Sequence, residues 1–479
     1  MDVLFVAAEV APFSKTGGLG DVAGALPQAL AARGHRVLVF TPRHGVVDPV
    51  AHRLEPLPFS LQAGAEAGGL WVARGPAPVF FLEHERYFGH RQGIYSEPGH
   101  EYGDNAERFA FFCRAALALP RLVGFRPRIL HLHDWHAALA AWLLRHEVPE
   151  GGAEPWVGEA RSVLTIHNLA HQGVFPKEAV PALGLPWSVF RYDGMEFHDR
   201  LNFLKGGLTF ADVLTTVSPT YAREILTPEQ GEGLDPLLRH RAGELHGILN
   251  GIDAVAWDPA RDPHLPAHFS PGHLAGKARC KAALQRELGL PVRPGVPLAV
   301  LVGRLADQKG IDIALAALPE LLAQDVQVAV LGTGRPDYER ALERLDRERP
   351  ERFRVRTRFD EGLAHRMEAG ADLFLMPSRF EPCGLNQMYS LRYGTVPVVR
   401  AVGGLADTVE DFDGKSRGTG FVFQEYSPGA LLTAVRRALD VYRDKAAWSG
   451  LVGRGMAQDN SWEQRAERYE ALYRRIAGS

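Results

Sequence analysis

Short runs of apolar residues alternate with amphipathic segments along almost the whole chain. In the first half, this pattern predicts strands at Val3–Ala8, Arg36–Thr41, Val79–Leu82, Ile129–His133, Ser162–Ile166 and Val213–Val217. A second series follows Gly295, with strands expected at Leu298–Val302, Val326–Leu331, Phe353–Thr357, Leu373–Met376 and Val396–Val399. Such alternation is typical of parallel sheets covered by helices. The pattern therefore predicts an α/β protein with two doubly wound parallel sheets.

The length of 479 residues also favours two domains, because a single core of that size is uncommon. We expect a first domain at 1–252 and a second at 253–458. In the terminal segment 459–479, we expect a helix at Trp462–Ala477 that packs back onto the first domain. The stretch Trp257–Gly272 carries four prolines and is expected to be the linker.

Ligands of doubly wound sheets bind in the crevice beyond the carboxyl ends of the strands. If two such crevices face each other, the site lies in a cleft between the domains. The polar and aromatic segment Arg86–Asn105 is expected to be a long loop beside that cleft. A helix is predicted at Gly20–Arg33, despite Pro27, which should start or kink it.

Composition narrows the possible partners and the compartment. The formal net charge of −3 gives no reason to expect nucleic acid or an anionic membrane as partner. No apolar stretch reaches the roughly 20 residues of a membrane span, and Met1–Glu9 lacks the basic start of a signal peptide. The three cysteines, Cys113, Cys280 and Cys383, form no disulfide framework. We therefore expect a cytoplasmic protein.

The first expected strand leads into a glycine-rich loop, Lys15–Asp21, which precedes a helix. Glycines there let backbone N–H groups approach an anion, and the helix N-terminus adds partial positive charge. Only eight of the 54 basic residues are lysine, yet Lys15 and Lys309 both lie in glycine-rich loops. An ammonium suits a phosphate oxygen. The alternatives are a tight turn and coincidence, since the loop is neither a G-x-G-x-x-G nor a Walker motif.

In the second half, Arg304 and Lys309 follow the strand expected at Leu298–Val302. Both could reach one diphosphate and stabilise the charge that develops as a sugar–phosphate bond breaks. The alternative is two solvated surface cations. After a later strand, Glu381 precedes Gly384 and Leu385, whose backbone N–H groups open a helix and could bind phosphate.

A metal site is not expected. His131, His133, Asp134 and His136 are close in sequence, but no second His or Cys cluster completes a zinc site. The D-x-D sequence 411–413 lies in a polar turn that is typical of a surface loop. Because cations are available for the leaving group, we expect neither a metal nor a cofactor.

Seven motifs occur in one order along nearly the whole chain. Together they resemble the bacterial glycogen synthase and plant starch synthase family, and this resemblance implies a GT-B fold: two Rossmann-like domains with the active site between them. The motifs are KTGGL (15–19), HLHDWHA (His131–Ala137), TIHNLAHQG (Thr165–Gly173), LNGID (Leu249–Asp253), GRLADQKG (Gly303–Gly310), PSRFEPCGLNQ (Pro377–Gln387) and GGLADTV (Gly403–Val409).

The resemblance also implies roles for individual residues. Catalytic positions are Glu381, which faces the sugar, Asp134 and His167, which contact the transferred glucose, and the cations Lys15, Arg304 and Lys309. Substrate-binding positions are Lys15, Gly17, Gly18, Glu9, Asp21, Tyr95, Asn250, Phe359, Cys383, Gly384, Leu385 and Thr408.

Some of these roles have alternatives. His167 and Phe359 could be ordinary core residues, and Cys383 could be a reactive thiol rather than a small neighbour of the sugar. Related retaining transferases often carry a second glutamate eight positions after the first. Tyr389 stands there, which puts a two-carboxylate mechanism in doubt.

The implied reaction transfers glucose from ADP-glucose to an α-1,4-glucan with retention of configuration. The expected partners are therefore ADP-glucose and a glycogen or malto-oligosaccharide acceptor. UDP-glucose or a sucrose- or trehalose-type transfer are alternatives within the class. A non-catalytic glucan-binding protein is the alternative from another class, but it would be expected to have lost Lys15, Arg304, Lys309 or Glu381.

Overall fold

The computed structural model describes residues 1–97, 100–147 and 155–478. It divides into two compact units, one formed by Met1–Gly251 with Trp462–Ser479 and the other by Ile252–Ser461. The chain thus passes from the first unit to the second after residue 251 and returns to the first unit after residue 461. From the sequence, we expected these two boundaries after residues 252 and 458. Among the described residues, no helix is long and apolar enough to cross a membrane.

The first unit is built on a nine-stranded sheet with the order β14-β13-β9-β8-β1-β2-β5-β4-β3. Strands β14 to β5 run parallel, and β4 is antiparallel to both β5 and β3. The strands are β1 (Asp2–Val6), β2 (Arg36–Pro42), β3 (Glu55–Ala63), β4 (Glu66–Ala73), β5 (Val79–Glu83), β8 (Ile129–His133), β9 (Arg161–Ile166), β13 (Val213–Thr216) and β14 (Leu245–Gly247).

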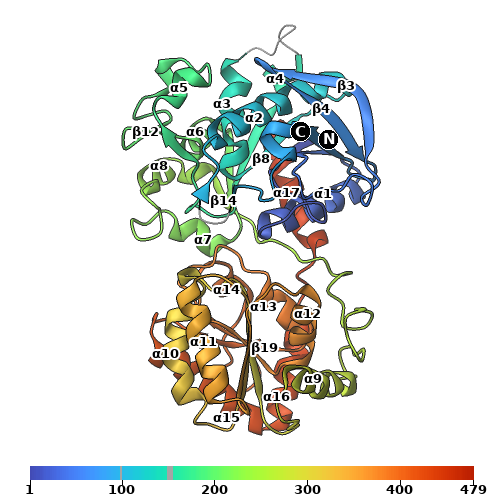
Figure 1. The fold of residues 1–479 in the computed structure, drawn as a ribbon, viewed down its shortest axis with the longest axis vertical. Helices are drawn as coiled ribbons and strands as arrows, with labels where there is room; N and C mark the ends of the chain where they lie inside the picture. Colours follow the sequence, from blue (N-terminus) through green and yellow to red (C-terminus); the bar gives the residue numbers. More distant parts are fainter. Residues whose placement is uncertain (98–99, 148–154, 479) are drawn as a thin grey trace. The chain divides into compact units, whose positions relative to one another are not determined.

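Helices cover this sheet (Figure 1). The helices of the first unit, on or around the sheet, are α1 (Gly18–Ala32), α2 (Asn105–Leu122), α3 (Asp134–His146), α4 (Pro155–Glu159), α5 (Ala179–Ala182), α6 (Phe203–Phe210), α7 (Pro219–Glu224), α8 (Asp235–His240) and α17 (Trp462–Ala477). A small antiparallel sheet consists of β10 (Val174–Pro176), β11 (Glu196–Phe197) and β12 (Arg200–Asn202).

The C-terminal helix α17 lies beside α1 in the first unit, although the two are at opposite ends of the chain (Figure 1). Trp462, Tyr469 and Tyr473 of α17 join one buried cluster with Leu26 of α1. The Tyr473 hydroxyl also lies 2.7 Å from His131 Nδ1 on the central strand β8. The amphipathic pattern of α17 thus packs one face of the helix onto the first sheet.

The second unit has a six-stranded parallel sheet with the order β17-β16-β15-β18-β19-β20. Its strands are β15 (Leu298–Val302), β16 (Gln327–Leu331), β17 (Phe353–Arg356), β18 (Leu373–Met376), β19 (Val396–Arg400) and β20 (Phe421–Phe423). Its helices are α9 (Ala275–Leu288), α10 (Ile311–Leu321), α11 (Pro336–Glu348), α12 (Glu361–Gly370), α13 (Asn386–Arg392), α14 (Gly403–Thr408), α15 (Pro428–Arg443) and α16 (Lys445–Met456).

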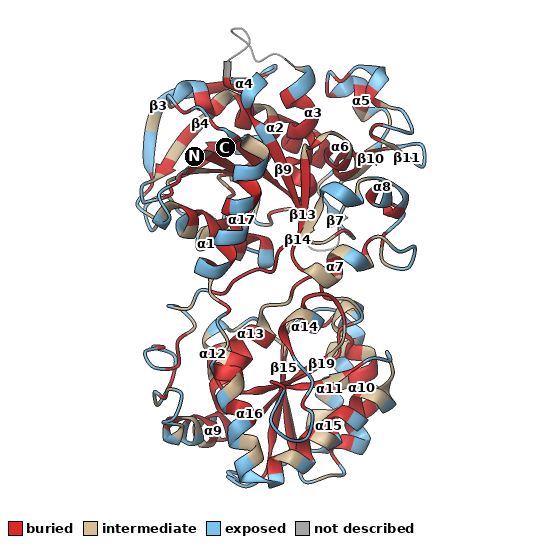
Figure 2. Ribbon diagram, turned by 180° about the vertical axis from the view of Figure 1, so that it is seen from behind, coloured by how far each residue is buried: buried red, intermediate tan, exposed pale blue. Residues whose placement is uncertain are grey.

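Neighbouring residues of β15 point to opposite faces of this sheet. Leu301 packs in a cluster with α10, and Val300 packs in a cluster with α9 and α12. Helices therefore cover both faces, and the strands in the middle are buried along their length (Figure 2). Burial on both faces explains why parallel strands are continuous apolar runs in the sequence.

Each sheet has a point at which the strand order reverses. In the first unit β1 lies between β2 and β8, and in the second unit β15 lies between β16 and β18. The loops that leave β1 and β8 diverge to opposite sides, as do those that leave β15 and β18. Such switch points are where doubly wound sheets bind ligands, and the glycine-rich loops of the sequence follow these strands.

The stretch Trp257–Gly272 is not the linker that its prolines suggested, because it is packed inside the second unit. Asp262 is buried and accepts a hydrogen bond from Nδ1 of His365, 2.7 Å away. Leu265 and Phe269 belong to the core cluster of that unit. The prolines prevent regular secondary structure, but the apolar side chains between them are still buried.

Two other parts of the first unit differ from the expectation. The β3–β4 hairpin was missed because the exposed strand β3 has no apolar run. The expected loop Arg86–Asn105 contains most of a short π-helix, Glu85–Gly89, and two short strands, β6 (Ser96–Glu97) and β7 (His100–Glu101).

Candidate active site

Glu9 organises the loop that follows β1. Its Oε2 accepts hydrogen bonds from the backbone N–H groups of Thr16 and Gly17, at 2.5 and 3.2 Å. Its Oε1 accepts from the Thr16 hydroxyl and from the Tyr95 hydroxyl, both at 2.6 Å. Glu9 is buried. Its carboxylate is thus used to hold the KTGGL loop and Tyr95 in place.

The KTGGL loop leaves open space around its glycines. A Cβ atom added at Gly17 or Gly18 would meet no atom within 4 Å. Lys15 is half exposed, and its Nζ lies 2.7 Å from Oδ1 of Asp21. Helix α1 begins at Gly18 without a side-chain cap. A cation and the start of a long helix therefore meet at an open surface, an arrangement suited to an anion.

Asp134 begins α3 at the end of β8 and has an unusual backbone. Its φ of +55° lies in the left-handed region, which costs about 1–3 kcal/mol for a residue other than glycine. Its Oδ1 accepts a hydrogen bond from the backbone N–H of His167, at 2.7 Å. Burial raises the pKa of Asp134 to about 7, and backbone hydrogen bonds from His167 and Asn168 oppose that rise.

His167 is fixed by a second histidine. Its Nε2 lies 2.9 Å from Nδ1 of His133, so the N–H of one ring donates a hydrogen bond to the unprotonated nitrogen of the other. Burial lowers the pKa of His167 to about 3 and places the pKa of His133 well below its ordinary value. Both rings are therefore neutral at pH 7. The Asp134–His167 hydrogen bond joins two predicted site residues from the ends of neighbouring strands.

The histidines near β8 are engaged with other groups rather than arranged around a metal. Besides Tyr473, His131 contacts the Thr165 hydroxyl at 2.6 Å, and His136 stacks on the Tyr95 ring at 4.4 Å. In the described part of the chain, no group of three or more His, Cys, Asp or Glu residues could hold a metal ion.

Both carboxylates of the D-x-D sequence are engaged with other groups of the second unit. Asp411 Oδ1 accepts a hydrogen bond from the backbone N–H of Val422 at 2.8 Å, and Oδ2 lies 2.9 Å from Arg437. Asp413 Oδ1 accepts hydrogen bonds from three backbone N–H groups, those of residues 415, 416 and 417. Asp413 thus stabilises the turn itself, and Asp411 joins it to β20 and α15.

Lys309 and Glu381 form an ion pair at the switch point of the second unit. Nζ of Lys309 lies 2.6 Å from Oε2 of Glu381. The Ser378 hydroxyl donates to the same oxygen at 3.0 Å. Glu381 is only 4% exposed, so its charge is held by these two donors away from bulk water. Two predicted catalytic residues from different loops are thus brought together.

Glycines let the three loops of this site pack against one another. Gly310 has φ +69°, and a Cβ there would lie 1.9 Å from the Pro377 carbonyl oxygen. Gly403 has φ +43°, and a Cβ there would lie 1.9 Å from the Glu381 carbonyl oxygen. The GRLADQKG, PSRFEPCGLNQ and GGLADTV motifs therefore form one packed assembly.

Helix α13 ties this assembly to β15. The Asn386 side chain donates to the Val302 carbonyl at 2.9 Å, and the Gln387 side chain donates to the Thr408 hydroxyl at 3.1 Å. Thr408 in turn donates its hydroxyl hydrogen to the Gly404 carbonyl at 2.6 Å. Cys383, just before α13, is buried and forms no disulfide.

Of three other predicted site residues, Arg304 and Phe359 are exposed and Asn250 is buried. Arg304 is exposed just after β15 and donates to the Gln308 side chain at 3.2 Å. Phe359 is 86% exposed, which excludes the alternative of a core phenylalanine. Asn250 is buried in the first unit, and its Oδ1 has no hydrogen-bond partner among the described residues.

Sequence analysis missed the loop that follows β16. The Thr333 carbonyl accepts a hydrogen bond from Leu305 N at 2.9 Å, and Arg335 N donates to the Leu305 carbonyl at 2.8 Å. Arg335 also lies 2.7 Å from Asp307. This loop therefore supports the one that carries Arg304 and Lys309. The signal was available, since G-T-G directly follows an expected strand.

Comparison with known protein families defines the class. A family model described as "Starch synthase catalytic domain" matches residues 2–240. A second, described as "Glycosyl transferases group 1", matches residues 289–449. With two Rossmann-like units and charged loops at both switch points, these matches define a GT-B glycosyltransferase.

Individual relatives define the family. The chain is 70% identical to a glycogen synthase of Anaeromyxobacter dehalogenans strain 2CP-C, over 100% of both chains. It is 51% identical to a glycogen synthase of Myxococcus xanthus, over 99% of both. The catalytic domain of starch synthase IV from Arabidopsis thaliana, solved with ADP and acarbose, superposes with a TM-score of 0.91 at 35% identity, covering 100% of this chain and 99% of that one. The chain belongs to the glycogen and starch synthase family.

The resemblance inferred from the motifs is confirmed by these relatives, and so is the GT-B fold. Sucrose-phosphate synthase from Thermosynechococcus elongatus shares the fold with a TM-score of 0.60, at 19% identity over 99% of this chain and 98% of that one. At that identity, the likeness concerns the fold alone.

Proposed function

We propose that this enzyme transfers glucose from ADP-glucose to the non-reducing end of an α-1,4-glucan, with retention of configuration. The observation that carries the proposal is the ion pair of partly buried Lys309 with buried Glu381 at the switch point of the second unit, with Arg304 on the same loop as Lys309. A carboxylate and two cations at that point suit a sugar joined to a diphosphate. The family membership of the chain supports the same donor class.

In this proposal the second unit binds the nucleotide sugar. Arg304 and Lys309 stabilise the charge that builds on the diphosphate as the glycosidic bond breaks. The backbone N–H groups of Gly384 and Leu385 contribute to phosphate binding. The Thr408 hydroxyl, which donates to the Gly404 carbonyl, would turn to donate to a phosphate oxygen. Exposed Phe359 offers a ring for the nucleotide base.

Glu381 is proposed to stabilise the oxocarbenium-like sugar without forming a covalent bond. Lys309 and the Ser378 hydroxyl both contact its Oε2 and hold the side chain in place. A covalent route would need a carboxylate nucleophile opposite the leaving group. At the place where related transferases carry a second glutamate, the Tyr389 ring stacks on Trp257. The small buried Cys383 leaves room for the sugar beside Glu381.

The first unit is proposed to bind the transferred glucose and the acceptor. Asp134 and neutral His167 bind glucose hydroxyls, and the strained backbone of Asp134 supports a functional role. Lys15, Asp21 and the open glycines Gly17 and Gly18 form the KTGGL surface. Glu9 and Tyr95 hold that surface in position, and buried Asn250 contributes a further polar group.

Retention is proposed to follow a front-face route in which the leaving diphosphate helps to deprotonate the incoming 4-hydroxyl. Catalysis then consists mainly of positioning and electrostatic stabilisation. Cationic side chains fill the role that a divalent metal would have, so we propose metal-independent turnover and no cofactor. We also propose a cytoplasmic enzyme, which suits its three buried cysteines, none of them in a disulfide.

The test is the release of ADP when the purified protein is incubated with ADP-glucose and glycogen. UDP-glucose in a parallel reaction decides the nucleotide preference, and excess EDTA decides the metal question. We expect ADP release that depends on glycogen and persists in EDTA. Glucan binding without turnover would favour the non-catalytic alternative, and turnover that returns only with added magnesium would refute the cationic account of the leaving group.

A further inference from the structure

Trp257 lies between two aromatic rings of the second unit. Its ring is 3.7 Å from that of His365 on α12 and 3.9 Å from that of Tyr389 on α13, centroid to centroid. The planes differ by 10° in both pairs. Both faces of the indole are therefore covered. We call the rings of His365, Trp257 and Tyr389 the Trp257 stack.

One end of the stack is fixed by a buried carboxylate. Asp262 Oδ2 lies 2.7 Å from Nδ1 of His365 and accepts a hydrogen bond from the Tyr393 hydroxyl at 2.6 Å. The Asp262 side chain is completely buried. Because buried hydrogen bonds to a charged group are costly to break, His365 is a rigid support for Trp257.

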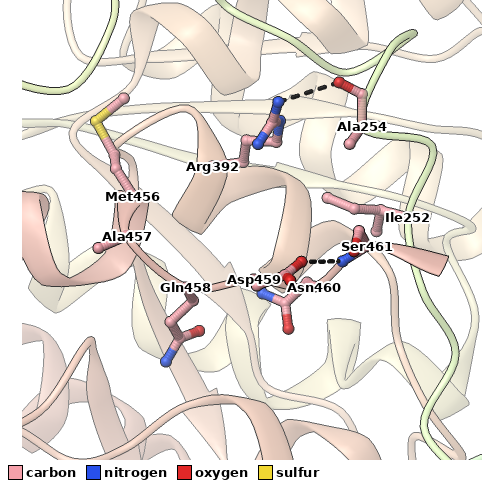
Figure 3. Close-up of a pocket in the computed structure, with 9 residues that line it drawn as sticks. All are labelled: Ile252, Ala254, Arg392, Met456, Ala457, Gln458, Asp459, Asn460 and Ser461. Carbon is pink, nitrogen blue, oxygen red and sulfur yellow. Dashed lines mark hydrogen bonds between the residues drawn. The ribbon is translucent and has the colours of Figure 1, made fainter. Parts of the chain in front are cut away.

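The same segment also holds the far end of α13. Nε of Arg392 donates to the Trp257 carbonyl at 2.6 Å, and NH2 donates to the Ala254 carbonyl at 3.0 Å. Figure 3 shows the bond to Ala254 at the edge of a pocket of about 250 Å³. Tyr389 and Arg392 are three residues apart, so they share one face of the helix. That face rests on residues 254–257.

The opposite end of α13 reaches the proposed donor-binding loops. Asn386 donates to the Val302 carbonyl at the end of the strand that precedes Arg304. The Gln387 side chain donates to the carbonyls of Cys383 and Gly384, at 3.1 and 3.0 Å. A shift of α13 would therefore move the loop that carries Glu381.

We propose that Trp257 is a positioning residue for the transfer reaction: it fixes α13 and thereby the Glu381 loop that binds the donor. This inference rests on the proposed function, because it assigns the donor to that loop. It also gives Tyr389 a role, since an aromatic ring where a second glutamate might stand completes the Trp257 stack. A displacement of about 1 Å in such a loop can cost on the order of 10²-fold in rate.

The simpler explanation is that Trp257 only adds packing to the second unit. Trp448 on α16 provides a matched control, because it is also half-buried and contacts one tyrosine, Tyr442, at 5.0 Å. Among the described residues, the ring contact of Trp448 is with Tyr442 on α15. Trp257→Leu and Trp448→Leu therefore remove similar packing from the same unit, and only the first disrupts the stack.

Both variants of the full chain are compared in thermal stability, hydrogen exchange of backbone amides 384–389, the Kd for ADP, and kcat and KM for ADP-glucose. We expect both to melt at lower temperature. Only Trp257→Leu should exchange these amides faster, bind ADP at least about tenfold more weakly and lose about 10- to 100-fold in kcat/KM. Trp257→Phe, which keeps an aromatic ring, should retain most of the wild-type ADP affinity and kcat/KM.

Tyr389→Leu tests the stack from its other side. It should reproduce the Trp257→Leu effects, and the double variant should lose less than the product of the two single losses. If Trp257→Leu does not fold, Tyr389→Leu alone keeps the proposal testable by the same exchange and ADP-binding measurements.

Equal amide exchange and equal ADP affinity in Trp257→Leu and Trp448→Leu would overturn the proposal. Wild-type protein that releases no ADP from ADP-glucose would instead refute the proposed function. The exchange comparison needs no turnover, so it separates the two failures.

Discussion

Three buried carboxylates of the site have different surroundings, and these surroundings set what each can do. Glu9 accepts hydrogen bonds from its own loop and from Tyr95, so it shapes that loop. Glu381 pairs with a lysine beside the proposed sugar position. Asp134 is bound by backbone N–H groups, and burial raises its pKa. The sequence shows all three as acidic residues after strands and does not distinguish these roles.

Glu381→Gln keeps the shape of the side chain and removes its charge. We expect kcat to fall by roughly 10²–10³, as for other groups that stabilise transition-state charge. Affinity for ADP should change little, because ADP lacks the sugar. Steady-state kinetics and calorimetry with ADP check both values. A fully active variant would exclude an electrostatic role, and a glucosyl ester found on Glu381 by mass spectrometry would exclude the non-covalent one.

Lys309→Ala or Arg304→Ala should also lower kcat by roughly 10²–10³. Here the KM for ADP-glucose should rise too, since the phosphates are charged before the bond breaks. Lys415→Ala is the control, because Lys415 is an exposed cation of the 411–417 turn. If both single variants matched this control in kcat and KM, the two cations would be ordinary surface groups.

Asp134→Asn tests the raised pKa of this residue. A folded pKa of about 7, against 3.8 ordinarily, means that the fold favours the protonated carboxyl. That contribution to stability is fully present below pH 3.8 and is lost as the pH rises through about 7. Asparagine resembles the protonated form and tolerates a left-handed backbone. The stability of the variant relative to that of wild type should therefore increase when the pH is raised from 5 to 8.

Scanning calorimetry at both pH values checks this sign. If the difference in Tm between the variant and wild type is the same at pH 5 and at pH 8, Asp134 is ionised at both pH values in the folded protein. The activity of the variant should fall at either pH, because a neutral amide replaces a group proposed to bind glucose.

At the scale of elements, the sequence predicts the buried strands. It does not predict the exposed strand β3 or the burial of a segment through polar contacts. The strands β1 and β15 are continuous apolar runs because both faces of each sheet are covered. The hairpin strand β3 is largely exposed, so its sequence lacks that signal. The proline-rich segment 257–272 looked like a linker because its burial depends on Asp262 meeting His365, about a hundred residues later.

The candidate site was predictable to a similar extent. The motifs mark which loops carry charged groups at strand ends, and the structure joins Lys309 to Glu381 and Asp134 to His167. The support of the Arg304 and Lys309 loop by Thr333 and Arg335 was missed. The G-T-G sequence after β16 indicates a turn, but it does not show which distant loop that turn contacts.

The close packing of the second-unit loops leads to a prediction of its own. Gly403→Ala places a Cβ against the Glu381 carbonyl oxygen, 1.9 Å away in the present backbone. The Glu381 loop must then move, so we expect kcat to fall at least about tenfold. Gly414→Ala is the control, since Gly414 also has positive φ, +81°, but a Cβ there meets no atom within 4 Å.

Both alanine variants should lose about 1 kcal/mol of stability from the left-handed backbone. Only Gly403→Ala should lose activity at a temperature where both proteins are folded. Equal kinetics in the two variants would mean that the loop tolerates the added methyl group, contrary to the packing described here.

At the scale of the whole molecule, each unit presents its own cluster at its own switch point. The first carries Asp134, His167 and the KTGGL loop, and the second carries Arg304, Lys309 and Glu381. The central claim is that these two clusters serve one reaction, the retaining transfer of glucose from ADP-glucose to an α-1,4-glucan.

The most direct test is the structure of the product. The enzyme is incubated with maltohexaose and ADP-glucose that carries ¹³C in its glucose, and the product is examined by NMR. The account predicts a labelled glucose at the non-reducing end, joined by an α-1,4 bond, with no added metal. A β-linked product, label released only as free glucose, or label joined at another position would contradict it.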